Sequence, residues 1–149
     1  MNKSSRDISE GPDPGRVAPF SGAAPGTSFG PVEYEVPATA NDRYWDAAGI
    51  THPARIHGFL YPPMAANLTI MAFQTIAPAP LLHTAQRIEC HATALAPNTL
   101  SVAGIVTARF ERRGREYIEV TTTVTDSADV HLWTSIATFT EAGTSGAAA

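Results

Sequence analysis

The stretch Arg55-Ile-His-Gly-Phe-Leu-Tyr-Pro-Pro-Met-Ala-Ala-Asn-Leu-Thr-Ile-Met-Ala-Phe-Gln-Thr-Ile76 decides how the rest of this chain must fold. It begins with a glycine-bearing turn and continues as a helix that is apolar on nearly every side. Pro62 and Pro63 suit the first turn, where a backbone N–H has no helical partner, and Pro78 and Pro80 end the helix. A helix this apolar must be buried on most of its sides.

The rest of the sequence supplies strands to bury that helix. Apolar and polar residues alternate with period two, and turn residues separate the runs, which is the pattern of antiparallel hairpins. A short helix around Tyr44 is predicted to begin with Thr39 as its cap and to end at Gly49. The predicted strands are residues 32–36, 86–95, 100–111, 116–125 and 130–140. We therefore predict an α+β fold in which an antiparallel β-sheet, with a four-stranded meander after the helix, wraps around a long central helix.

The length of the chain, 149 residues, suits one domain with a substantial core. Residues 1–29 are rich in Gly, Pro, Ser and Ala, so they bury too little apolar surface to offset their ordering entropy. We predict a flexible N-terminal arm there, a single domain over residues 30–142, and a disordered tail over residues 143–149.

Charge and composition argue against several kinds of partner. The chain has 10 Lys and Arg against 14 Asp and Glu and no basic tract, so we expect no nucleic-acid partner. No apolar run approaches the roughly 20 residues of a membrane-spanning helix, so we expect no membrane partner and a cytoplasmic location. Cys90 is the single cysteine, which excludes an intrachain disulfide, and it is predicted to pack on the apolar face of its strand.

Two stretches carry a resemblance to a known family. The first is Asn41-Asp-Arg-Tyr-Trp-Asp-Ala-Ala-Gly-Ile-Thr-His-Pro53 with Ile56-His-Gly-Phe-Leu-Tyr-Pro-Pro63, and the second is Ala108-Arg-Phe-Glu-Arg-Arg-Gly-Arg-Glu-Tyr-Ile-Glu-Val120. Together they resemble the MaoC-like dehydratase/hydratase family of the hot-dog fold, in its dehydratase-like N-terminal-domain branch. The resemblance implies an acyl thioester carried on coenzyme A or acyl carrier protein, a 2-enoyl hydration or 3-hydroxyacyl dehydration, an Asp/His acid–base pair and no cofactor.

The chain departs from that family at the residues that perform the chemistry. The family's motif is approximately Tyr-x-x-Ala-x-Gly-Asp-x-Asn-Pro-x-His, whereas this chain reads Tyr44-Trp-Asp-Ala-Ala-Gly-Ile-Thr-His-Pro-Ala-Arg55. Ile50 thus stands at the Asp position and Arg55 at the His position. An isoleucine cannot transfer a proton, and an arginine stays protonated near neutral pH.

Three interpretations follow from this departure. The chain is an acyl-binding half whose hot-dog partner supplies the dyad, or other residues have taken over the proton transfer, or the pocket serves another ligand, such as a polyketide-like intermediate. A non-catalytic accessory protein, a thioesterase and a biosynthetic dehydratase or cyclase remain as alternatives to a hydro-lyase. In every case the exposed edge strand of a hot-dog sheet predicts a homodimer, or a heterodimer with another hot-dog subunit.

Seven residues are our site candidates. Histidine suits proton transfer near neutral pH, and Gly58 could offer a backbone N–H to the thioester carbonyl because no Cβ blocks the approach. The catalytic candidates are His52, His57 and Asp46, and the substrate-binding candidates are Gly58, Tyr61, Asn67 and Arg55. Each also has an ordinary structural role available, such as packing, loop hydrogen bonding or a surface ion pair.

Two further groups of residues bear on phosphate binding and metal binding. Arg112, Arg113 and Arg115 cluster in one predicted hairpin turn, where they could bind the phosphates of the carrier or simply be solvated. His83, His91 and His131 are scattered and lack the tight spacing of metal ligands, so we expect no metal.

Overall fold

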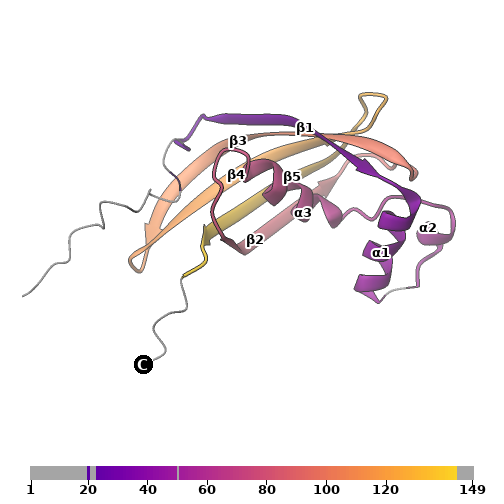
Figure 1. Cartoon of the computed structure of the whole chain (residues 1–149), viewed down its shortest axis with the longest axis horizontal. Coiled ribbons are helices and arrows are strands. Elements are labelled where there is room, and N and C mark those ends of the chain that lie inside the picture. The colour runs from indigo at the N-terminus through magenta and orange to yellow at the C-terminus, as the bar shows by residue number, and fades with distance from the viewer. Residues whose placement is uncertain (1–19, 21–22, 50, 144–149) are drawn as a thin grey trace, which may run out of the picture.

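A computed structural model describes residues 20, 23–49 and 51–143. Its elements follow the predicted order, with one short helix that the sequence did not reveal (Figure 1). They are β1 (Ser28–Val36), α1 (Ala38–Ala48), α2 (Pro53–Ile56), α3 (Met64–Phe73), β2 (Leu81–Cys90), β3 (Asn98–Arg112), β4 (Arg115–Thr125) and β5 (His131–Glu141).

The five strands form one antiparallel sheet in the order β1-β3-β4-β5-β2. The predicted meander is therefore correct for β3, β4 and β5 but wrong for β2, which pairs with β5 at the far edge. The connection from β2 to β3 does not form a hairpin because it runs across the end of the sheet. Along it, the N–H of His91 donates to Leu132 O at 2.7 Å, and the N–H of Ala96 donates to Gly58 O at 2.9 Å.

The sheet curves around α3, as predicted (Figure 1). The inward residues of β4 are buried because β-strand side chains alternate between faces, and Val120 and Val124 lie opposite Val106 and Val102 of β3. The buried residues of α3 are Met64, Ala65, Leu68, Thr69, Ala72 and Phe73. The helix is shorter than its apolar sequence, and its outer side is uncovered, with Met71 at 42% exposure.

A small polar network joins α3 to the sheet beneath it. Thr69 Oγ1 lies 2.7 Å from Thr122 Oγ1 of β4 and donates to Ser135 Oγ of β5 at 3.0 Å. All three residues are fully buried. Gln86 of β2 donates to the same Ser135 Oγ at 2.7 Å, so the hydroxyls are satisfied and fix the position of the helix over the sheet.

The ordered domain begins before the predicted boundary at residue 30. Phe20 and Ala23 are fully buried in the core, and Arg109 of β3 donates to Phe20 O at 3.1 Å. The predicted arm is therefore wrong for these residues and for the start of β1. The rest of the arm, residues 1–19 and 21–22, and the tail after residue 143 lie outside the described residues.

Several local predictions also change. β2 begins five residues earlier than predicted and ends at Cys90, which is exposed rather than packed as a small hydrophobe. Pro37, not Thr39, is the cap residue of α1 and makes no side-chain capping bond, whereas Gly49 ends the helix in the left-handed conformation, as expected. In the described part of the chain, no helix is long and apolar enough to cross a membrane.

Candidate functional site

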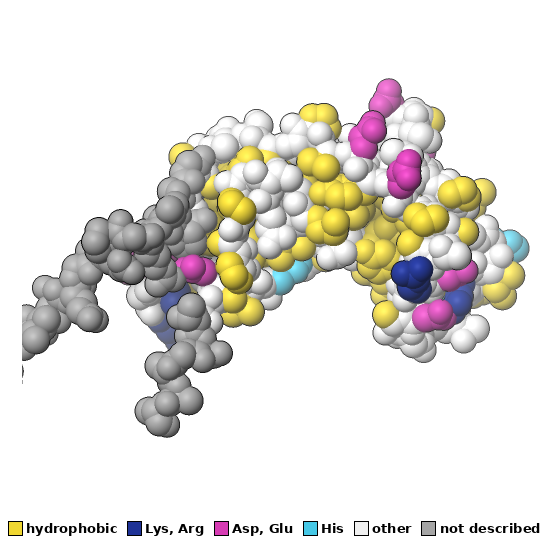
Figure 2. Space-filling model, viewed as in Figure 1, with side chains coloured by type: hydrophobic (Ala, Val, Ile, Leu, Met, Phe, Trp, Pro, Cys, Tyr) yellow, Lys and Arg dark blue, Asp and Glu magenta, His cyan; other side chains and the backbone are white. Residues whose placement is uncertain are grey.

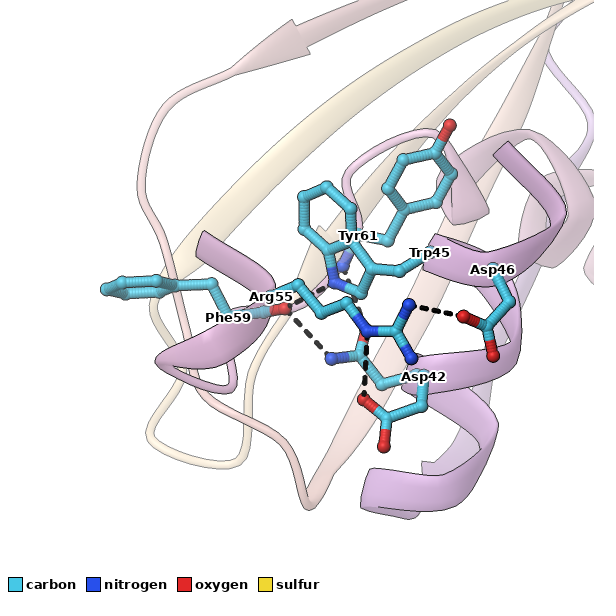
Figure 3. A network of polar contacts seen from close by, with 7 residues as sticks. Asp42, Trp45, Asp46, Arg55, Phe59 and Tyr61 are labelled. Atoms are coloured by element: carbon cyan, nitrogen blue, oxygen red, sulfur yellow. Dashed lines mark hydrogen bonds and ion pairs between the residues drawn. The ribbon is translucent and has the colours of Figure 1, made fainter. Parts of the chain in front are cut away.

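The candidate site lies where α1, α2 and the loop leading into α3 meet, at one end of the sheet (Figures 1 and 3). Its organising residue is Asn41 of α1, which is 1% exposed. Asn41 Nδ2 donates to Phe59 O at 2.8 Å, and Asn41 Oδ1 accepts from the N–H of Tyr61 at 2.9 Å. The indole N–H of Trp45 donates to the same Phe59 O at 3.0 Å. These contacts hold the loop in front of α3 against α1.

Sequence reasoning missed both Asn41 and Trp45. A signal was present, because residues four apart lie on one face of a helix, and that face of α1 carries an asparagine and a tryptophan. A carboxamide can satisfy one backbone N–H and one backbone C=O at once. The sequence did not show that the loop would present both groups at the same place.

Arg55 is held by carboxylates of α1. Its guanidinium forms an ion pair with Asp46, and its Nε lies 4.0 Å from Asp42 Oδ1 (Figure 3). The side chains are partly exposed, so such pairs contribute only about 0–1 kcal/mol to stability. The contact nevertheless gives the carboxylate of Asp46, a catalytic candidate, a structural partner in Arg55.

The two histidine candidates are both exposed. His52 caps α2, because its Nδ1 accepts from the N–H of Ala54 at 3.0 Å. Its ring also stacks on Trp45 with 5.9 Å between centroids and 8° between planes. His57 follows α2 directly. Among the described residues, Asp46 forms no hydrogen bond with either histidine, so the three catalytic candidates share a neighbourhood without forming an acid–base pair.

Gly58 has the positive φ, +77°, that its residue type favours. Its N–H donates to Arg55 O at 3.0 Å, and its carbonyl accepts from Ala96. α3 begins only at Met64. The predicted use of this N–H for a substrate carbonyl therefore requires the bond to Arg55 to open.

Asn67 and Tyr61 come together around a residue that sequence reasoning did not select. Asn67, exposed on the outer side of α3, donates through Nδ2 to the phenol oxygen of Tyr44 at 2.8 Å. The Tyr44 ring lies 6.4 Å from that of Tyr61, which in turn meets the Trp45 ring edge-on at 4.8 Å. The Tyr44 hydroxyl can still donate its own hydrogen. A largely apolar pocket on α1 adjoins this group and is lined by Ala40, Arg43, Tyr44 and Ala47.

The predicted arginine-rich turn lies far from this site, and Ile50 lies outside the described residues. The turn that contains Arg112, Arg113 and Arg115 joins the end of β3 to the start of β4. It lies at the end of the sheet opposite α1, because the start of β3, where Asn98 pairs with Val36, is the end next to α1 (Figure 1). It therefore adds no charge to the site within one chain, and Arg112 lies over the Phe110 ring at 5.8 Å. Ile50, the residue at the family's Asp position, lies outside the described residues.

Chemically, the described residues can bind and orient a ligand through Tyr44, Asn67 and the aromatic rings beside them. They present no carboxylate and histidine in mutual contact at this end of the sheet. The side chains of Arg55, Asp46 and His52 instead make local contacts with one another's segments.

Comparison with models of known protein families gives no match, and no curated protein matches the sequence. Solved structures do match. An (R)-hydratase from A. caviae involved in PHA biosynthesis is 12% identical, with a TM-score of 0.64, over 80% of this chain and 97% of that one.

An R-hydratase from Pseudomonas aeruginosa is 14% identical, with a TM-score of 0.66, over 83% of this chain and 84% of that one. The HadBC (3R-hydroxyacyl-ACP dehydratase) complex from Mycobacterium tuberculosis gives 18% identity and a TM-score of 0.59, over 78% of this chain and 96% of that one. These identities are low and the likeness is one of fold. The chain therefore has the predicted hot-dog fold, as do solved (R)-hydratases and dehydratases.

Proposed function

We propose that this chain is the acyl-binding subunit of a MaoC-like hydro-lyase, in which a second hot-dog subunit supplies the Asp/His pair. The observation that carries the proposal is the state of Arg55. It stands where the related motif has its catalytic histidine, and it is tied to the carboxylates of Asp46 and Asp42. An arginine in two ion pairs is a structural cation and cannot act as a general acid or base near neutral pH.

The reaction itself explains why a partner is needed. Hydration of a 2-enoyl thioester requires a base that deprotonates water and an acid that protonates the α-carbon, both within hydrogen-bond reach of the substrate. On this chain the two motif positions hold Ile50 and Arg55, and the nearby His52 caps α2. Binding groups, in contrast, are present, because the Tyr44 hydroxyl and Asn67 amide face outward beside an apolar pocket.

Exposed surface on α3 and β2 supports assembly with a second subunit. Apolar side chains gather over α3 in the middle of the face shown in Figure 2, and Met71 is 42% exposed. β2 is an edge strand whose residues 82–87 are all exposed, including Leu82. A free edge with exposed apolar side chains favours pairing with another chain. HadBC provides an example of a structurally similar chain in a dehydratase complex.

Binding and turnover, measured separately, test the proposal. The purified chain should bind a saturated acyl-coenzyme A in titration calorimetry, and it should not hydrate the corresponding 2-enoyl thioester. Tyr44→Phe keeps the ring and removes the hydroxyl, so it should weaken binding, whereas Thr84→Ala on the distant edge strand should not.

Three results would count against this function. Turnover by the chain alone that is abolished in His52→Ala or His57→Ala would make it a complete enzyme. Thioester hydrolysis, with release of free coenzyme A, would make it a thioesterase. A folded chain that binds no acyl thioester, alone or with a partner, would favour an accessory protein for another ligand.

A further inference from the structure

Two histidines that are 40 residues apart in the sequence meet on the solvent-facing side of the sheet. His91 follows the end of β2, and His131 begins β5; their ring centroids are 4.4 Å apart. Both Nε2 atoms approach one oxygen, because Thr134 Oγ1 lies 2.9 Å from His91 Nε2 and 3.0 Å from His131 Nε2. Both imidazoles are exposed. Of the other three histidines, His52 and His57 lie at α2, and His83 lies near the other end of β2 against the Phe139 ring.

A fourth atom that can coordinate a metal ion lies beside the two Nε2 atoms and the Thr134 hydroxyl oxygen. The backbone carbonyl of Trp133 lies 3.1 Å from His131 Nε2. Neighbouring ligands around a tetrahedral metal ion with bonds of about 2.0–2.2 Å are themselves about 3.3–3.6 Å apart. The present contacts of 2.9, 3.0 and 3.1 Å are hydrogen bonds, so these atoms lie within a few tenths of an ångström of ligand spacing and must move apart slightly to bind an ion. Two imidazole nitrogens with oxygen donors form a set that suits Cu²⁺, Ni²⁺ or Zn²⁺.

We propose that His91 and His131 form a binding site for a divalent late transition-metal ion, with Thr134 and the Trp133 carbonyl beside it. The ion binds the Nε2 lone pairs of both imidazoles. In the described part of the chain, no group of three or more His, Cys, Asp or Glu residues surrounds a common point, so water completes the coordination. Because the site joins the end of β2 to the start of β5, a bound ion fastens the edge strand to the sheet.

The protons can be placed from the contacts. A carbonyl only accepts, so the contact with Trp133 is made by a protonated Nε2 of His131, and the Thr134 hydroxyl then donates to His91 Nε2. Metal binding requires the His131 proton to move to Nδ1, which leaves both imidazoles neutral and releases no proton. Charged side chains on the same face include Glu89 and Arg87 of β2, which pair with each other at 2.8 Å, and Glu119 of β4, opposite Thr138.

Zinc titration of the full-length, tag-free protein tests this site. Calorimetry with ZnCl₂, repeated with NiCl₂, should show one ion per chain, and the thermal midpoint should rise with metal concentration. His91→Gln keeps a hydrogen-bonding side chain for Thr134 and removes the imidazole, so it should weaken binding at least about tenfold, as should His131→Gln. His83→Gln on the same edge strand is the matched control and should bind like the wild type.

The outcomes separate a metal site from a purely hydrogen-bonded pair. Loss of zinc binding in both folded variants, with the His83 control unaffected, supports the site. Absence of zinc binding by the wild type, or unchanged binding in either His91→Gln or His131→Gln, overturns it. Neither readout involves acyl thioesters, so the result is independent of the proposed function.

Discussion

Replacement of Asn41 by alanine should destabilise the protein, because this side chain holds the loop in front of α3 against α1. The variant removes the donor to Phe59 O at 2.8 Å and the acceptor for the Tyr61 N–H at 2.9 Å, at a residue that is 1% exposed. A hydrogen bond contributes a net value of about 1 kcal/mol, and a buried N–H left without a partner costs about 1–3 kcal/mol. We therefore expect a loss of about 2–4 kcal/mol in the free energy of unfolding.

Urea unfolding, followed by circular dichroism, measures this loss from the midpoint and slope of the transition. Asn67→Ala is the matched control, since it removes the same carboxamide from an exposed position with one hydrogen bond to Tyr44. The control should cost less than about 1 kcal/mol. If Asn41→Ala unfolds within about 0.5 kcal/mol of the wild type, the idea that this side chain holds the loop is incorrect.

Three further changes probe the packing and assembly. Thr69→Val removes a buried hydroxyl from the network under α3 and should lower stability by about 1–3 kcal/mol in thermal unfolding; an unchanged or higher midpoint would contradict this. Gly104→Ala places a Cβ 2.3 Å from the Phe29 ring, so calorimetric unfolding should reveal a loss of about 1–3 kcal/mol, and wild-type stability would show that the ring moves freely. Leu82→Lys adds a charge to the exposed edge of β2 and should shift the proposed subunit pair toward monomer in light scattering after gel filtration; an unaltered mass would place the proposed interface elsewhere.

The sequence predicted the elements whose pattern is set locally. The run from Met64 indicated a buried helix because it is apolar on nearly every side. The alternation in β3, β4 and β5 left a periodic signal because one face of each strand is buried. Gly49 marked the end of α1 because a left-handed residue is needed there. The edge position of β2 was missed since its residues are exposed on both faces and their alternation carries no information about a partner.

The site was harder to predict because its contacts join distant segments. Asp46 and Arg55 were both candidates, yet their pairing depends on how α2 folds back on α1, and α2 itself was not predicted. Asn41 was overlooked because a lone asparagine has no periodic signature. His91 and His131 meet only because β2 pairs with β5, a crossing that the predicted meander did not contain.

A binding subunit and a complete enzyme are distinguished by 2-enoyl thioester hydration, measured for the purified chain alone and for the chain reconstituted with a hot-dog partner that carries an Asp/His pair. We expect acyl-thioester binding but no turnover by the chain alone. In the complex we expect turnover that falls when the partner's dyad is mutated and when Tyr44 is replaced by phenylalanine. Sustained hydration by this chain without a partner would contradict the proposed binding role.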